Sequence, residues 1–148
     1  MKVSIVTSYF NRKQLLINTL KSIKKTKHED FEVIIVDDAS SEEHRIEDLI
    51  SQFPFIKVLR INENDKWYVN PCVPFNKAFS MATGDVVIIQ NPECFHTEDI
   101  ITYVANNLKS KDYMVFGCYS ISEKDTDLLT EKDRKSTRLN SSHVSESR

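Results

Sequence analysis

Short apolar runs alternate along the chain with stretches in which apolar residues recur every three or four positions. The short runs predict five strands, at residues 2–8, 31–36, 56–60, 85–89 and 113–116. The intervening stretches predict helices, with inward-facing Leu16, Leu20 and Ile23 in the first and the same spacing within residues 46–53, 75–82 and 100–108. Strands separated by helices form right-handed βαβ units. The pattern therefore predicts an α/β fold: a three-layer, Rossmann-like domain with a mostly parallel sheet and ligands at the carboxyl ends of its strands.

The alternation stops near residue 122, which predicts one domain over residues 1–122 and a disordered tail over residues 123–148. Residues 133–143 read DRKSTRLNSSH, which resembles the translation of a common DNA-sequencing adapter. We therefore expect residues 133–148 to be an artefact of sequence assembly and the domain to be truncated. The alternative is a genuine basic tail that contacts RNA.

Charge and composition exclude several function classes. The formal net charge of −2 gives no reason to expect nucleic-acid binding. No apolar run is long enough for a transmembrane segment, and the N-terminus lacks the composition of a secretory signal. These features favour a cytoplasmic protein, including one held at the cytoplasmic face of the membrane.

Glycine is scarce, and this limits how the fold can bind phosphate. The chain has 2 glycines, Gly84 and Gly117, so neither a GxGxxG fingerprint nor a GxxxxGK[ST] loop is present. Gly84 is expected to end the helix that precedes it. Among α/β folds, the absence of a glycine-rich loop favours the classes of protein that bind a diphosphate through a metal ion and carboxylates.

Polar residues follow the first strand in the sequence Thr7-Ser-Tyr-Phe-Asn-Arg12. At a strand end, Tyr9 can stack on a nucleobase, Thr7 can hydrogen-bond the edge of the base, and Arg12 can approach phosphate. The alternative is that Tyr9 and Asn11 only turn the chain into the next helix.

Acidic residues follow the second and fourth strands. Asp37 and Asp38 suit a ribose hydroxyl or a base N–H, or else cap the following segment. Asn91 and Glu93 offer oxygen ligands for a divalent cation. His96 is expected to be simply solvated.

The polar loop of residues 61–70 carries two adjacent aromatic residues, Trp67 and Tyr68. These rings can stack on a sugar, or they can close over the edge of the core.

Four motifs in order, VSIVTSYFNR, EVIIVDDAS, NKAFSMATGD and QNPE, resemble the family-2 glycosyltransferases of the GT-A fold over about residues 2–117. The resemblance implies that Thr7, Tyr9 and Asp38 contact the nucleobase. It also implies that Asp37 lies towards the base or ribose, with Arg12 as a weaker nucleotide contact.

The resemblance further implies a metal site, in which Asn91 and Glu93 occupy the two ends of the family's Asp-x-Asp motif and hold Mg²⁺ or Mn²⁺. Three positions depart from the family pattern. Ala39 replaces the glycine of the acidic turn, Phe10 splits the usual Tyr-Asn pair, and Asn91 removes one negative charge from the metal motif.

The implied activity is transfer of a sugar from a nucleoside-diphosphate sugar, UDP- or dTDP-linked, to a saccharide, lipid or protein acceptor, with inversion. The family's catalytic base lies downstream, and nothing after Gly117 matches it, so this fragment is expected to lack the acceptor side and to be inactive alone. Two other classes stay open: a degenerate, non-catalytic transferase-like binding module, which Asn91 favours, and a nucleotidyltransferase-like domain, which the missing glycine-rich loop disfavours.

Overall fold

The computed structural model describes residues 1–122 of the chain. The chain divides into two compact units, Met1–Asn107 and Leu108–Arg148. Residues 108–122 contain no helix or strand, so the strand expected at residues 113–116 is wrong. The tail of residues 123–148 lies outside the described residues, and the domain limit near residue 122 stays a prediction.

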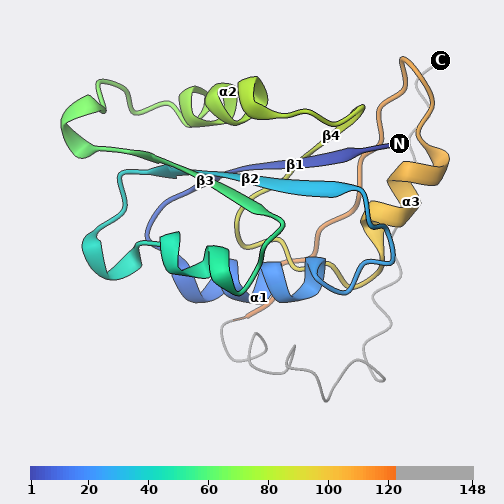
Figure 1. Ribbon diagram of the computed structural model, residues 1–148, viewed down its shortest axis with the longest axis horizontal. Coiled ribbons are helices and arrows are strands. Elements are labelled where there is room, and N and C mark those ends of the chain that lie inside the picture. The colour runs from blue at the N-terminus through green and yellow to red at the C-terminus, as the bar shows by residue number, and fades with distance from the viewer. Residues whose placement is uncertain (123–148) are drawn as a thin grey trace. The chain divides into compact units, whose positions relative to one another are not determined.

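The first unit is built on a parallel sheet of four strands, β1 (Val3–Tyr9), β2 (Phe31–Asp38), β3 (Ile56–Ile61) and β4 (Val86–Ile89), in the order β3-β2-β1-β4. Each of the pairings is parallel, so the first four predicted strands are confirmed. All four carboxyl ends therefore lie at one edge of the sheet, on the left in Figure 1.

Three α-helices and three short 3-10 helices join the strands: α1 (Lys13–Ile23), α2 (Cys72–Met81), α3 (Ile100–Asn107), η1 (Glu42–His44), η2 (Glu47–Ser51) and η3 (Glu63–Asp65). The α-helix expected within residues 46–53 is wrong, because only η2 forms there. Arg45 before it is extended, at ψ 145°, and Pro54 follows closely, so little more than one turn fits between them. Leu49 still packs into the core.

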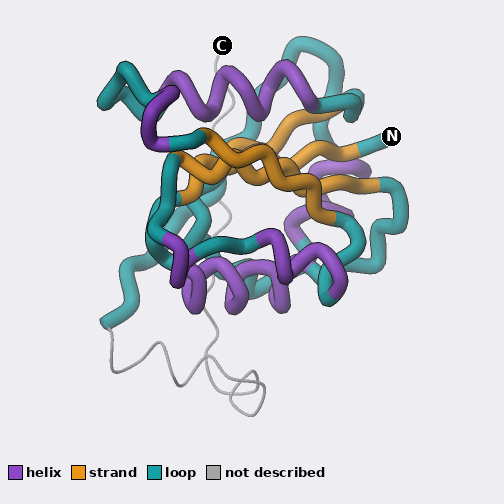
Figure 2. Tube along the Cα trace, turned by 60° about the vertical axis from the view of Figure 1, so that its left-hand side comes forward, coloured by secondary structure: helices purple, strands orange, loops and turns teal. Residues whose placement is uncertain are grey.

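Each face of the sheet is covered, which confirms the three-layer arrangement (Figures 1 and 2). On one face, side chains of α1, η2 and α3 join a core with the odd-numbered residues of β1 and β2, such as Ile5 and Ile35. On the other face, α2 packs through Ala78 onto even-numbered residues such as Val6 and Ile34. No helix among the described residues is long and apolar enough to cross a membrane.

The order of the strands creates a reversal between β1 and β4. The chain passes from β1 to β2 to β3 on the α1 side, and then crosses by α2, on the other face, to β4 beyond β1. In open α/β sheets, ligands bind in the crevice outside the carboxyl ends at such a reversal. A ligand site is therefore expected at the loops after β1 and β4.

Gly84 does not end a helix as the sequence suggested, since α2 stops at Met81 with Ala82 as its C-cap. Instead, Gly84 lies where the chain enters β4, and its N–H donates to Ser4 Oγ at 2.8 Å. A Cβ atom at Gly84 would lie 2.6 Å from Ser4 N and 2.9 Å from Lys2 O. Close approach of two backbones, not a left-handed conformation, therefore requires glycine here.

Replacing Gly84 with Ala should lower the free energy of unfolding by about 1–3 kcal/mol, because the new Cβ atom overpacks against backbone that cannot rotate away. Urea denaturation followed by circular dichroism measures the loss. The double variant Ser4→Ala/Gly84→Ala should recover little, since it removes only the hydroxyl and leaves the two backbone contacts. A Gly84→Ala protein as stable as the unsubstituted chain would contradict this packing.

Candidate active site

Asp37 and Asp38 end β2 and point to opposite faces of the sheet. Side chains alternate along a strand, and Ile35 belongs to the core under α1 whereas Val36 belongs to the core under α2. Continuing the alternation places Asp37 on the α1 face and Asp38 on the α2 face. The two adjacent carboxylates therefore have different surroundings.

Asp37 is fully buried and is held entirely by groups of the protein. Its Oδ1 accepts the backbone N–H of Ser40 at 2.9 Å, and its Oδ2 accepts Arg60 NH1 at 2.7 Å. Arg60 NH2 also donates to the Ser40 carbonyl at 2.6 Å. Asp37 thus closes the turn after β2 against β3.

The turn requires a left-handed residue at Ala39, where φ is 65°. This confirms that alanine here adopts a backbone that favours glycine, at a cost of about 1–2 kcal/mol. The loop after β1 contains a second such residue, Asn11, at φ 50°. The Asn11 N–H donates to Ser40 Oγ at 3.0 Å, and Asn11 Oδ1 accepts the Ser41 N–H at 2.9 Å. The two loops are therefore tied together.

Tyr9 and Thr7 point into the protein from β1. Tyr9 is 0% exposed, and its hydroxyl donates to the His44 carbonyl at 2.8 Å. Burial and the neighbouring Asp37 raise the pKa of Tyr9 to about 12, so the hydroxyl stays a neutral donor. Thr7 is also buried. In this conformation neither side chain is open to a nucleobase, and their contact with a nucleotide stays a prediction.

Phe10 is an aromatic residue at this edge that is open to solvent, with half of its surface exposed. Lys66 Nζ lies 5.1 Å from the centre of its ring. The sequence treated Phe10 as an interruption of a motif. Tyr9, the last residue of β1, points inward, whereas Phe10, directly after the strand, is half exposed.

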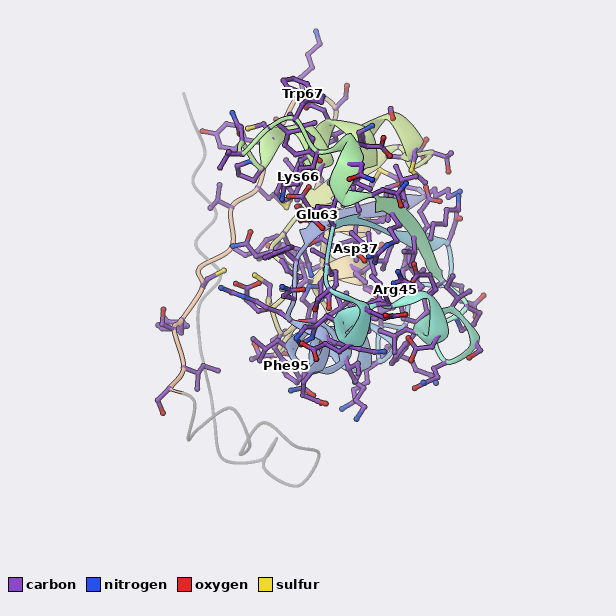
Figure 3. The ribbon with its side chains drawn as sticks, turned by 90° about the vertical axis from the view of Figure 1, so that its left-hand side faces the viewer. Asp37, Arg45, Glu63, Lys66, Trp67 and Phe95 are labelled. Atoms are coloured by element: carbon purple, nitrogen blue, oxygen red, sulfur yellow. The ribbon has the colours of Figure 1, made fainter. Side chains whose placement is uncertain are left out.

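Asp38 anchors the loop between β3 and α2. Its Oδ1 accepts the Tyr68 hydroxyl at 2.7 Å, and its Oδ2 lies 2.9 Å from Lys66 Nζ. Burial and this hydrogen bond raise the pKa of Tyr68 above its usual range. Figure 3 looks onto this edge, with Asp37 near the centre and Lys66 and Trp67 above it. Tyr68 closes over the core, whereas Trp67 is 84% exposed.

The loop after β4 reaches the loop after β1 through an ion pair. Arg12 NH1 lies 2.6 Å from Glu93 Oε1. The pair is partly open to water, with 56% of the Arg12 side chain and 34% of the Glu93 side chain exposed. Asn91 is exposed on the same loop. The structure thus brings two predicted site residues together across the reversal between β1 and β4.

His96 is not solvated, contrary to the expectation from the sequence. Its Nε2 lies 2.7 Å from Gln90 Oε1, and its backbone N–H donates to Ser22 Oγ at 3.0 Å. Burial lowers the pKa of His96 to about 4, although the nearby Asp99 opposes the shift. The backbone of His96 therefore fastens the loop after β4 to α1, while its neutral ring contacts Gln90 within that loop.

Two cationic residues of the site, Arg60 and Lys66, were not predicted from the sequence. Arg60 is the next-to-last residue of β3 and Lys66 follows η3, and each lies under 3 Å from one carboxylate of the Asp37-Asp38 pair. Arg60 was visible in principle, because a parallel β3 places its last residues beside those of β2. Lys66 was not, since its loop has no register with the sheet.

A parallel sheet with a strand-order reversal and helices on both faces defines an open α/β domain of the Rossmann-like class. The comparison with known families agrees. The pattern described as glycosyl transferase family 2 matches residues 4–146. The chain belongs to this family. The matched range extends into the tail for which an adapter origin is predicted, and resequencing of the locus decides that origin.

Curated relatives include the uncharacterized glycosyltransferase alr2836 of Nostoc sp. (strain PCC 7120), 32% identical over 59% of this chain and 26% of that protein. The uncharacterized glycosyltransferase YwdF of Bacillus subtilis (strain 168) is 25% identical over 93% of this chain and 47% of its own length. The chain thus spans less than half of either relative.

Solved structures share the fold. S. aureus TarS 1-349 in complex with UDP-GlcNAc has a TM-score of 0.60 and 22% identity, over 71% of this chain and 30% of that one. The mannosyltransferase PcManGT from Pyrobaculum calidifontis, in complex with GDP-Man and Mn²⁺, has a TM-score of 0.57 and 18% identity, over 72% of this chain and 33% of that one. These likenesses confirm the predicted GT-A fold.

The different surroundings of Asp37 and Asp38 predict different effects on stability. Asp37→Asn leaves Arg60 without its buried partner and should lower the free energy of unfolding by about 2–4 kcal/mol. Asp38→Asn keeps an oxygen for Tyr68 and should cost about 1 kcal/mol. Urea denaturation of both variants checks the order, and equal losses would contradict the separate roles.

His96 predicts a pH dependence of stability. The folded pKa, about 4, lies below the ordinary value of 6.5, so the unfolded chain binds a proton before the folded one does. The free energy of unfolding should therefore fall as the pH drops from about 6.5 to 4, by up to about 1.4 kcal/mol per unit. His96→Gln, which keeps a polar group beside Gln90, should remove this slope. Identical slopes in both proteins would show that His96 is not held neutral.

Proposed function

We propose that this chain supplies the donor-binding domain of a glycosyltransferase and binds a nucleoside-diphosphate sugar at the carboxyl ends of β1, β2 and β4. One observation carries the proposal: a half-exposed aromatic ring, Phe10, lies beside the Lys66–Asp38 ion pair at that edge. A flat apolar face next to a hydrogen-bonding carboxylate is what a nucleobase requires.

In this proposal the base stacks on Phe10, and Asp38 accepts an N–H of the base. Asp38 is 8% exposed, so it is shielded from water but reachable once Lys66 moves. Tyr9, Thr7 and Asp37 then act as positioning residues that hold the turns, since their side chains are buried. A uracil or thymine ring can donate its N3–H to Asp38, so UDP- or dTDP-linked donors fit this arrangement. In this proposal Phe10, and not Tyr9, makes the aromatic contact with the base.

Arg12 is proposed to contact the diphosphate, because its guanidinium lies at the reversal between β1 and β4 and is partly exposed. Asn91 and Glu93 would supply two oxygen ligands to Mg²⁺ or Mn²⁺. The residues fit such an ion, since Glu93 already accepts a cationic group in this structure, and Mg²⁺ commonly combines one or two carboxylates with substrate phosphates and water. The bound ion would stabilise negative charge on the departing diphosphate.

The proposed reaction is attack by a hydroxyl oxygen of the acceptor on the anomeric carbon of the sugar. The bond from that carbon to the diphosphate breaks on the opposite side, so the configuration inverts. The acceptor would be a saccharide, lipid or protein. We assign no catalytic base among residues 1–122, and we place the protein in the cytoplasm or at the cytoplasmic face of the membrane.

The single tryptophan of the chain provides a direct binding assay. Trp67 is exposed and stands between Lys66 and Tyr68, which both hold Asp38. Binding of a base at Asp38 should therefore change Trp67 emission in a saturable way during titration with UDP or dTDP. Asp38→Ala and Phe10→Ala should each weaken binding at least about tenfold, because each removes one base contact.

A matched control is Asp48→Ala, which removes an exposed carboxylate that pairs with Lys13 and not with Lys66 or Arg12. Its nucleotide affinity should equal that of the unsubstituted chain. Failure of UDP, dTDP and GDP to bind, measured also by calorimetry, would overturn the proposal. Binding without sugar transfer by the complete gene product would instead favour a non-catalytic binding module.

A further inference from the structure

The Arg12–Glu93 ion pair joins the two loops that border the strand-order reversal. It brings together the group proposed for the diphosphate and the carboxylate proposed for the divalent cation, at 2.6 Å. Arg12 occupies Oε1 of this carboxylate, and its positive charge opposes a second cation beside the same group. The two partners of Glu93 therefore compete.

The protein supplies too few ligands to hold a cation by itself. Among residues 1–122, no three side chains of the His, Cys, Asp or Glu types cluster in a way that could hold a metal ion. Asn91 contributes a neutral oxygen where a second carboxylate would add charge. A divalent cation at Glu93 thus depends on phosphate oxygens for its remaining ligands.

We propose that Arg12 is an internal counter-cation that keeps Glu93 occupied until a nucleoside diphosphate arrives. The diphosphate then draws Arg12 away and exposes the carboxylate, so that the nucleotide and the divalent cation bind cooperatively. This inference rests on the proposed function, because it assumes that the diphosphate lies at this edge.

The strength of the pair suits an exchange of partners. Ion pairs that are open to water contribute little, about 0–1 kcal/mol, and more than half of the Arg12 side chain is exposed. A diphosphate offers arginine several charged oxygens and a bidentate geometry. Arg12 can therefore leave Glu93 for the diphosphate at small cost, and it keeps a counter-charge in both states.

Two measurements on the full chain test the exchange, and neither needs activity. The first is binding of Mn²⁺ alone, followed by the EPR signal of unbound Mn²⁺. The second is binding of UDP without metal, in EDTA, followed by Trp67 emission. Arg12→Met should raise the affinity for Mn²⁺ alone about two- to fivefold, because its competitor is gone. The same variant should lower the metal-independent affinity for UDP by a similar factor.

Opposite changes in the two affinities distinguish competition from damage, since a poorly folded variant would bind both ligands less well. Lys13→Met is the matched control. It removes a positive charge one residue away, from a lysine that pairs with Asp48 and not with Glu93, and it should leave both affinities unchanged. Glu93→Gln combined with Arg12→Met should abolish the gain in Mn²⁺ affinity.

Two results would overturn the inference: Arg12→Met with unchanged or weaker Mn²⁺ binding, or Lys13→Met with the same gain in Mn²⁺ affinity. In either case the proposed function would stand as long as UDP binds and Asp38→Ala weakens it. Absence of UDP binding to the unsubstituted chain would instead refute the proposed function itself.

Discussion

The buried Asp37 carboxylate organises the carboxyl edge of the sheet. A charge that is removed from water is very costly unless opposite charge and hydrogen-bond donors surround it. Arg60 and the Ser40 N–H meet this need from two directions. Because Arg60 also binds the Ser40 carbonyl, the turn after β2 cannot relax without leaving the carboxylate unpaired. That constraint explains why the left-handed backbone at Ala39 is tolerated.

The same turn orders the loop after β1. The backbone N–H of Ser40 donates to Asp37, and the Ser40 hydroxyl oxygen accepts the Asn11 N–H. In return, the side-chain oxygen of Asn11 accepts the Ser41 N–H. The backbone from Tyr9 to Asn11 is fixed in this way before any ligand is present. Preorganisation of this kind lowers the ordering cost of binding.

Adjacent residues at the carboxyl edge have different surroundings. In each adjacent pair at the edge, one residue faces the α1 layer and is buried, as Tyr9 and Asp37 are. Its neighbour, Phe10 or Asp38, contacts Lys66 instead. Tyr9 and Asp37 support the turns, whereas the proposed base contacts use Phe10, which is half exposed, and Asp38, which is 8% exposed. Two other carboxylates at this edge also form ion pairs: Asp38 with Lys66, and Glu93 with Arg12.

The sequence by itself determined the layered α/β architecture, the parallel sheet and the strand ends at which the polar residues lie. Buried parallel strands appear as short apolar runs, and amphipathic helices repeat their apolar residues about every 3.6 positions, so both can be recognised in the sequence without knowing what they contact. The acidic turn and the polar loop after the fourth strand were identified for the same reason, because they directly follow apolar runs. The strand expected at residues 113–116 failed, since apolar composition alone does not provide a neighbouring strand.

Only the tertiary structure decided which face of the sheet each of these residues lies on and which cation each carboxylate receives. The resemblance assigned a base contact to Tyr9, and motif similarity cannot report that Tyr9 is buried and Phe10 half exposed. It missed Arg60 and Lys66 because ion pairs between Asp37 and Arg60, or between Asp38 and Lys66, join segments far apart in the chain. Such pairings depend on register and loop path, which exist only after the sheet has assembled.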